Sequence, residues 1–225
     1  MTFDVNGTVS GTNQNDTITV SRSAGTDITA GNGDDSISIA VSSGITADAG
    51  NGQDTVNLGF FATSSTASGG NGGDVLTANS SLGSVGSVTL SGGSGNDQIS
   101  GNRGADTLQG GNGDDSITGG IGDDLLTGGR GNDAFYYNYT ADSSNVVGTD
   151  GNDRITDFNV RQDQLVLHDT LGPTDTDRIV LTTVGNNTVI TFDGTSGVDN
   201  TITLEGVTGV ADLQAAVAAG WLVFA

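Results

Sequence analysis

The sequence predicts an all-β fold in which short parallel strands coil into a right-handed β-solenoid. A nine-residue unit runs five times in tandem from residue 92 to residue 136, with Gly at its first and fourth places, Asp at its sixth and an apolar residue at its eighth. Further copies of this unit begin at residues 11, 30, 49, 69 and 148. Self-similarity at a fixed period is the signature of a solenoid, in which each coil buries its apolar residues against its neighbours.

Two ladders of apolar residues advance along the chain in the same steps. The eighth-place residues recur at intervals of 19, 19, 20, 23, 18, 18 and 20 residues, and they are Ile18, Ile37, Val56, Leu76, Ile99, Ile117, Phe135 and Ile155. The second ladder repeats the first six intervals with Val9, Ile28, Ala47, Ala67, Leu90, Leu108 and Leu126. Two ladders with a common step indicate two short strands per coil, each with one inward residue, because alternate side chains of a strand point to opposite faces. The glycine-rich hexamers are then the corners.

The chain divides into three regions. Residues 1–91 are expected to form coils with the hexamer at one corner and Ser/Thr/Gly-rich loops, such as residues 20–26 and 58–66, at the other. Residues 92–168 are expected to form coils with hexamers at both corners, followed by a closing segment. Residues 169–225 are expected to form a small β-rich cap with a short helix near residues 209–219.

The hexamers are expected to stack along two edges of unequal length. The long edge would hold those that begin at residues 11, 30, 49, 69, 92, 110, 128 and 148. The short edge would hold only those at 101 and 119.

Composition limits the kinds of partner. The chain has 27 acidic residues, of which only Glu205 is Glu, against six arginines and no lysine, and its formal net charge is −21. This charge argues against binding to nucleic acid or to an anionic membrane surface. The absence of cysteine excludes disulfides and thiolate metal sites, and the absence of a long apolar run argues against membrane insertion.

The sixth-place Asp points to Ca²⁺. It is present in all ten copies, whereas a turn alone would accept Asn or Ser. Corners stacked about 4.8 Å apart would bring these carboxylates together, so they require a counter-ion. Ca²⁺–oxygen distances of about 2.3–2.6 Å suit an ion between two corners, whereas Mg²⁺ needs about 2.0–2.1 Å. Glycine lets backbone carbonyls turn toward such an ion.

Residues 8–168 resemble the RTX family of hemolysin-type calcium-binding repeats, which fold as a β-roll. The resemblance implies that the second to fourth places and the sixth-place Asp of adjacent corners hold about seven to ten Ca²⁺ ions. Three departures weaken the end copies, namely Thr12, Gln14 and Thr149. The expected metal-binding residues are Asp16, Gly31, Asn32, Gly33, Asp35, Gly50, Asn51, Gly52, Asp54, Gly70, Asn71, Gly72, Asp74, Gly93, Ser94, Gly95, Asp97, Asn102, Arg103, Gly104, Asp106, Gly111, Asn112, Gly113, Asp115, Gly120, Ile121, Gly122, Asp124, Gly129, Arg130, Gly131, Asp133, Gly151, Asp153, Asp157 and Asp163.

The end of the chain also resembles members of this family. Residues 136–169 are similar to the segment that closes the β-roll of secreted bacterial proteases and alginate epimerases, with Ile155, Phe158, Leu165 and Leu167 as its apolar plug. The tail over residues 169–225 resembles the serralysin-like C-terminal signal for type I secretion. The resemblance implies export by that machinery to the cell surface or the medium, so the N-terminus needs no Sec-type signal.

An enzymatic role is not expected. The chain has one histidine, His168, one Glu and neither Cys nor Lys, and no nucleophile motif accompanies them. We expect a secreted Ca²⁺-binding protein with a structural role at the cell surface or in the extracellular matrix, which folds on Ca²⁺ binding and self-assembles. Its open partners are a second copy of itself and a cell-surface polysaccharide. An uncapped first coil and the pair Phe60 and Phe61 favour self-association.

Two alternatives stay open. The chain could be a stand-alone, non-catalytic β-roll module that accompanies a secreted enzyme. It could also be an ice-binding solenoid, because Asn13, Asn32, Asn51 and Asn71 form a regular row at the third place of the hexamer. Ser94 and Arg130 interrupt that row, which argues against the second alternative.

Overall fold

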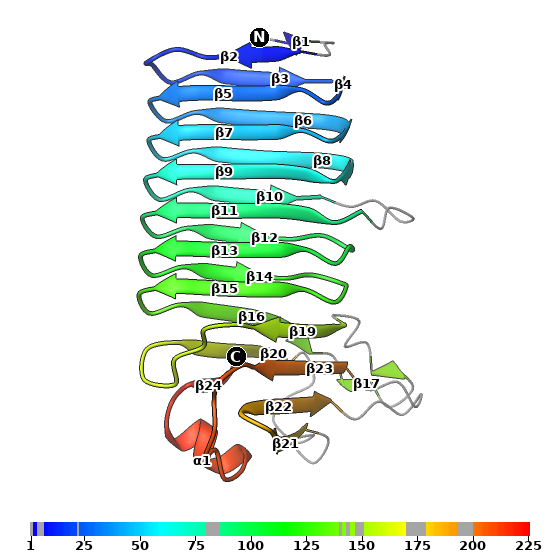
Figure 1. Ribbon diagram of the computed structural model, residues 1–225, viewed down its shortest axis with the longest axis vertical. Helices are drawn as coiled ribbons and strands as arrows, with labels where there is room; N and C mark the ends of the chain where they lie inside the picture. The colour runs from blue at the N-terminus through cyan, green and yellow to red at the C-terminus, as the bar shows by residue number, and fades with distance from the viewer. Residues whose placement is uncertain are drawn as a thin grey trace.

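The strands of the chain stack into a long solenoid, with the N-terminus at one end and the helix α1 (Leu213–Ala218) near the other (Figure 1). The structure is a computed structural model that describes residues 2–3, 7–21, 23–79, 86–139, 141–142, 145–146, 151–169, 179–192 and 200–225. Within this part of the chain the fold is all-β apart from α1. The prediction of an all-β parallel solenoid is confirmed.

Two large sheets form the walls of the solenoid. Sheet A contains, in spatial order, β1 (Thr2–Phe3), β3 (Thr17–Val20), β6 (Ser36–Ser43), β8 (Thr55–Thr63), β10 (Val75–Ala78), β12 (Gln98–Ser100), β14 (Ser116–Thr118), β16 (Ala134–Tyr139), β20 (Gln164–Asp169) and β24 (Leu222–Phe224), with β4 (Ser23–Ala24) beside β6. Sheet B contains β2 (Thr8–Ser10), β5 (Asp27–Asn32), β7 (Thr46–Asn51), β9 (Ser65–Asn71), β11 (Val88–Ser94), β13 (Thr107–Asn112), β15 (Leu125–Arg130), β19 (Asn152–Ile155), β23 (Asn200–Leu204), β22 (Asn187–Phe192) and β21 (Ile179–Val184). A separate ribbon pairs β17 (Ala141–Asp142) with β18 (Asn145–Val146).

The two apolar ladders lie in the core with the predicted register. On sheet A, Ile99 pairs with Ile117 and Ile117 with Phe135, and on sheet B, Leu90 pairs with Leu108 and Leu108 with Leu126. All these side chains are at most 2% exposed. Each coil therefore buries its inward residues against the equivalent residues of the coils on either side. This is the packing that the shared series of intervals predicts.

The early coils are wider than predicted. We expected one inward residue per strand and a loop over residues 58–66, but β6 and β8 have eight and nine residues. Their additional inward residues, Ile39 and Leu58, are at most 1% exposed. Alternation of apolar and polar residues through both stretches supports the longer strands, because it places a second residue of each strand in the core.

The copy of the repeat that begins at residue 148 lies on the short edge, so our prediction of the long edge was wrong. Ile155 pairs with Leu126 of sheet B, whereas Leu165 continues the ladder of sheet A by pairing with Phe135. The chain inserts an excursion that includes β17 and β18 between β16 and β19. Because of this insertion, Phe135 on sheet A and Ile155 on sheet B are only half a coil apart. Their separation of 20 residues is nevertheless that of a full coil elsewhere in the chain.

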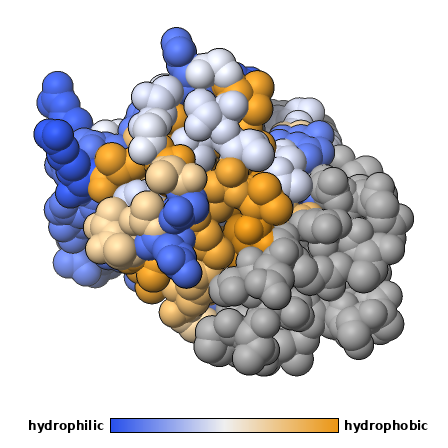
Figure 2. Space-filling view, turned by 90° about the horizontal axis from the view of Figure 1, so that it is seen from below, coloured by the Kyte–Doolittle hydropathy of each residue, from blue (hydrophilic) through white to orange (hydrophobic). Residues whose placement is uncertain are grey.

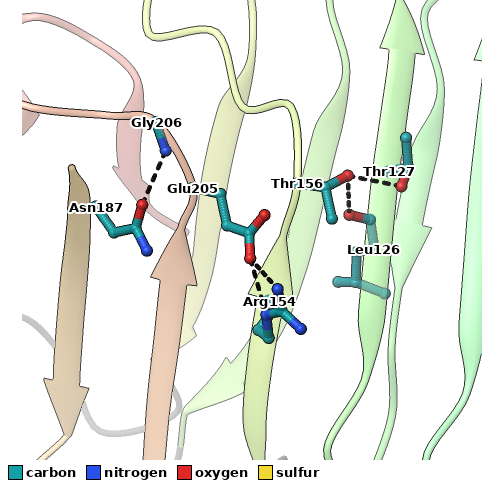
Figure 3. Close-up of polar contacts among 7 residues, drawn as sticks. All are labelled: Leu126, Thr127, Arg154, Thr156, Asn187, Glu205 and Gly206. Carbon is teal, nitrogen blue, oxygen red and sulfur yellow. Dashed lines mark hydrogen bonds and ion pairs between the residues drawn. The ribbon is translucent and has the colours of Figure 1, made fainter. Parts of the chain in front are cut away.

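The C-terminal cap continues sheet B. Strands β23, β22 and β21 follow β19, and Figure 3 shows the polar contacts at this junction. The hydroxyls of Thr127 and Thr156 lie 2.8 Å apart, and Arg154 forms an ion pair with Glu205. Strand β19 is thus joined by side chains to the last coil on one side and to the cap on the other.

The helix is shorter than predicted because its N-cap lies late. The side chain of Asp212 accepts a hydrogen bond of 2.8 Å from the amide of Ala215, which is the bond that an N-cap residue supplies. Gly209 has a φ of +79° and lies outside any helical turn. Gly220, also at positive φ, follows the last turn as predicted.

An aromatic cluster closes the end of the core. The ring of Phe158 lies 5.9 Å from that of Phe135 and 5.6 Å from that of Trp221, measured between centroids. The other predicted plug residues, Ile155, Leu165 and Leu167, are fully buried. The apolar plug is therefore confirmed, and Trp221 is a member that the sequence did not indicate.

Candidate metal-binding corners

In most corners the second and fourth places are sites where only glycine fits. Gly93 and Gly95 have φ values of +116° and +122°, a region that side chains disfavour. A Cβ on Gly93 would lie 2.1 Å from the carbonyl oxygen of Gly70, and a Cβ on Gly95 would lie 1.9 Å from that of Gly72. The glycine carbonyls of each coil therefore point toward the next coil, into the space between two corners.

The first place brings the carboxylate back under its own corner. A Cβ on Gly92 would lie 2.2 Å from Oδ2 of Asp97, and one on Gly110 would lie 2.3 Å from Oδ2 of Asp115. The Asp side chain thus occupies the room that a larger residue would need. Together, the three glycines leave room for backbone carbonyls and the carboxylate to face the space between two corners.

The sixth-place aspartates form a hydrogen-bonded ladder on each edge. In each step, the backbone N–H of one Asp donates to Oδ1 of the Asp in the next coil, at 2.7–3.1 Å on the long edge. The long ladder is Asp16, Asp35, Asp54, Asp74, Asp97, Asp115, Asp133 and Asp163. The short ladder is Asp106, Asp124 and Asp153, at 2.7–2.8 Å.

Five aspartates of the long edge have a buried oxygen without a hydrogen-bond partner. These side chains are at most 3% exposed, and they are Asp35, Asp54, Asp74, Asp97 and Asp115. In each of them Oδ1 is used by the ladder and Oδ2 has no partner. A buried carboxylate that lacks a compensating donor or cation is costly, so each of these oxygens is available to a bound ion.

Burial also raises the pKa values of these carboxyls. Desolvation raises the pKa of Asp115 to about 7, and the neighbouring charges of Asp97 and Asp133 add to this effect. Desolvation raises the pKa values of Asp54 and Asp74 to about 6. Both causes oppose the charged form, and a cation beside the carboxylates would relieve both.

The remaining predicted residues lie in distinct places. Asp163 joins the long ladder although its corner lacks the glycines, and Asp153 joins the short one. Asp157 lies outside both ladders, because its two carboxylate oxygens accept hydrogen bonds from the amides of Gly128 and Gly129 at 3.0 and 2.8 Å.

The third-place residues bind the coils to one another. The carbonyl oxygens of Asn51, Asn71, Ser94, Asn112 and Arg130 each accept a hydrogen bond of 2.7–2.8 Å from the fourth-place amide of the preceding coil. The amide side chains of Asn32, Asn51 and Asn71 continue a row from Asn13 through bonds of 2.8 Å. The carbonyls of the second and fourth places are thus better placed than those of the third to face an ion.

The donors present fit Ca²⁺. Carboxylate and carbonyl oxygens are the ligands of this hard cation, which accepts six to eight of them in flexible geometry. No group of three or more His, Cys, Asp or Glu side chains gathers around one point in the described part of the chain. The stacked carboxylates and the backbone carbonyls of adjacent corners are the donors that face the space between the coils.

The repeats match a known family model. The model described as "RTX calcium-binding nonapeptide repeat (4 copies)" matches residues 77–108 and 100–135. The solution structure of the AlgE6R3 subunit of the Azotobacter vinelandii mannuronan C5-epimerase is 33% identical, with 64% of this chain and 81% of that chain covered and a TM-score of 0.43. This chain belongs to the RTX calcium-binding repeat family. RTX nonapeptide repeats bind Ca²⁺ between turns.

Another solved structure is similar to this RTX chain. The extracellular lipase LipA of Serratia marcescens is 19% identical with a TM-score of 0.38, and the alignment covers 96% of this chain. The chain spans only 39% of the length of that lipase. Comparison with curated proteins finds no match.

Three further observations concern the RTX chain. No helix in the described ranges is long and apolar enough to cross a membrane. RTX repeats are typical of secreted proteins. His168 is exposed, and its ring lies parallel to that of Tyr136 with 6.0 Å between centroids.

Proposed function

We propose that this chain is a secreted, non-catalytic RTX protein that folds on binding Ca²⁺ and serves a structural role at the cell surface or in the extracellular matrix. The observation that carries the proposal is the row of five buried aspartates on the long edge, each with one carboxylate oxygen lacking a partner. Such a row has no use in a protein that folds without ions, because every member opposes burial.

The proposed ligands of one ion are the glycine carbonyls and carboxylates of two adjacent corners. Between the corners that end at Asp97 and Asp115, these are the carbonyl oxygens of Gly93 and Gly95 and the Oδ2 atoms of both aspartates. The other corners with glycine at the second and fourth places act in the same way, through these two carbonyls and the sixth-place carboxylate. Asp157 is the exception, because its carboxylate already caps two backbone amides.

Ca²⁺ binding supplies the free energy of folding in this proposal. The chain carries a net charge of −21, and its stacked carboxylates repel one another. A bound ion between them offsets this repulsion, so the free energy of ion binding becomes free energy of folding. Far-ultraviolet circular dichroism tests the coupling. In Ca²⁺-depleted buffer the β signal should be largely absent, and millimolar Ca²⁺ should restore it, whereas a full β signal without Ca²⁺ would refute the proposal.

Export belongs to the proposal because it explains how such a chain stays unfolded before it meets Ca²⁺. The cytosol holds little free Ca²⁺, so the chain would pass a type I exporter unfolded and fold outside, with its C-terminal region as the signal. Co-expression with a type I exporter tests this step. The full chain should appear in the medium only when the exporter is present.

Self-assembly is the further part of the proposed structural role. Among the described strands, β2 and β21 form the two ends of sheet B, so each leaves one backbone edge unpaired. Figure 2, which looks at the C-terminal end, shows hydrophobic residues at the surface there. Val180 of β21 is 46% exposed and Val184 is 62% exposed. Unpaired edges and apolar surface both favour association.

Sedimentation velocity at several Ca²⁺ concentrations tests assembly. Species larger than the monomer are expected at millimolar Ca²⁺, and Val184→Lys should reduce them if they form through β21. Phe60 and Phe61, the other predicted contact, belong to β8, but their side chains lie outside the described part of the structure. A strictly monomeric particle would favour an accessory module of a secreted enzyme system.

A further inference from the structure

Eight of the eleven corners of the two aspartate ladders fall into two kinds. In the open corners, Oδ2 of the sixth-place Asp has no partner, and these end at Asp35, Asp54, Asp74, Asp97 and Asp115. In three others, which we call latched corners, the second-place amide of the same corner donates to Oδ2. The latching bonds run from Thr12 to Asp16 at 2.6 Å, from Asn102 to Asp106 at 2.7 Å and from Asn159 to Asp163 at 2.8 Å.

A second hydrogen bond completes each latch. The side-chain oxygen of the second-place residue accepts from the amide two residues later: Thr12 from Gln14 at 3.2 Å, Asn102 from Gly104 at 2.7 Å and Asn159 from Arg161 at 3.1 Å. This is the local turn that Asn and Thr side chains favour. In the open corners the fourth-place amide, such as that of Gly95, donates instead to a backbone carbonyl of the next coil.

The second-place residue decides which kind of corner forms. The second-place glycines of the five open corners have φ values between +109° and +124°. Ser64 is the only residue other than glycine with positive φ among the described residues, so Thr12, Asn102 and Asn159 have negative φ. A side chain at the second place excludes the left-handed backbone, and the altered backbone turns the amide toward the carboxylate.

The latch competes with an ion for the carboxylate and leaves the carbonyl in position. A Cβ on Gly120 would lie 2.2 Å from the carbonyl oxygen of Asn102, the same arrangement that Gly93 shows toward Gly70 in an open corner. The second-place carbonyl thus still points into the space between coils. What differs is that Oδ2 of Asp106 already holds a hydrogen-bond donor.

We infer that Thr12, Asn102 and Asn159 are positioning residues that keep their corners from taking Ca²⁺, and that they cap the rows of ions. They stand at both ends of the long ladder and at the N-terminal end of the short one. The inference rests on the proposed function. Ca²⁺ would occupy first the spaces that the five open corners enclose between Asp35 and Asp115, while the end corners close without an ion.

Paired substitutions at Asn102 test the inference. Asn102→Gly removes the side-chain oxygen and permits positive φ, whereas Asn102→Ala removes the same oxygen and keeps the Cβ. The readout is the number of Ca²⁺ ions retained per chain after equilibrium dialysis at saturating Ca²⁺, measured by elemental analysis. Asn102→Gly should retain one Ca²⁺ more than the wild type, and Asn102→Ala the wild-type number.

Because Asn102 is buried, the same pair at the exposed Thr12 decides the matter if the Asn102 variants lose their circular dichroism signal. If the wild type binds Ca²⁺ but the Gly and Ala variants retain equal amounts of it, the inference about latched corners is wrong and the proposed function stands. A wild-type chain that retains no Ca²⁺ would overturn the proposed function and the latch with it.

Discussion

The contribution of one interior carboxylate can be separated into two parts by replacing Asp115. Its Oδ1 accepts the buried amide of Asp97 at 2.8 Å, and its Oδ2 has no partner in the protein. Asp115→Asn keeps an oxygen for the Asp97 amide and removes the charge that an ion needs. Asp115→Ala removes both, and an unsatisfied buried amide costs about 1–3 kcal/mol.

The expected result is a graded loss of stability. In millimolar Ca²⁺ both variants should melt below the wild type, and Asp115→Ala should melt about 2–12 °C below Asp115→Asn, because 1 kcal/mol shifts the melting temperature of a domain of this size by about 2–4 °C. Thermal unfolding followed by circular dichroism measures this. The matched pair Asp16→Asn and Asp16→Ala, at the half-buried first position of the ladder, should have smaller effects. Equal melting of Asp115→Asn and Asp115→Ala would refute the reasoning.

Three other predictions concern the corners, the core and pH. Gly72→Ala should abolish the Ca²⁺-induced circular dichroism signal, because its Cβ would lie 1.6 Å from the carbonyl oxygen of Gly52, whereas Gly73→Ala, with 3.1 Å to its nearest neighbour, should retain it. Leu108→Ala, at a fully buried position, should cost about 2–5 kcal/mol in urea unfolding with Ca²⁺ present, against at most about 0.5 kcal/mol for the exposed Gln109→Ala. The raised pKa values of Asp54 and Asp115, about 6 and about 7, mean that the ion-free fold gains stability as the pH falls through this range and loses it as the pH rises through it. Circular dichroism in Ca²⁺-depleted buffer should therefore show more β structure at pH 5 than at pH 7.5, while calorimetry should show weaker Ca²⁺ binding at the lower pH, and a loss of β structure on acidification would contradict the pKa assignment.

Periodicity was sufficient to predict the coils but not every corner. The series of intervals that the two apolar ladders share determined the register of both, because a solenoid repeats its contacts at each step. The same series of intervals led us to place Asp153 on the long edge. The chain inserts about half a coil before it, and the spacing from the preceding repeat is therefore close to that of a full coil. The corner that ends at Asp163 was missed as a repeat because it lacks glycine. Its signal is an Asn four residues before the Asp, as in the corner of Asn102 and Asp106.

The difference between the two kinds of corner has a consequence for how the solenoid holds together. In an open corner, the fourth-place amide and the carboxylate both connect to neighbouring coils, so one corner reaches its shape only with the next. In a latched corner the same groups are also satisfied within six residues of sequence, because the second-place residue binds the carboxylate and caps the turn. Coils with open corners therefore depend on their neighbours and, in the proposed function, on Ca²⁺, whereas latched corners carry local structure of their own. Two of the latched corners, those of Asp16 and Asp163, stand at the ends of the long ladder, where a terminal corner lacks a further corner of the same row to stabilise it.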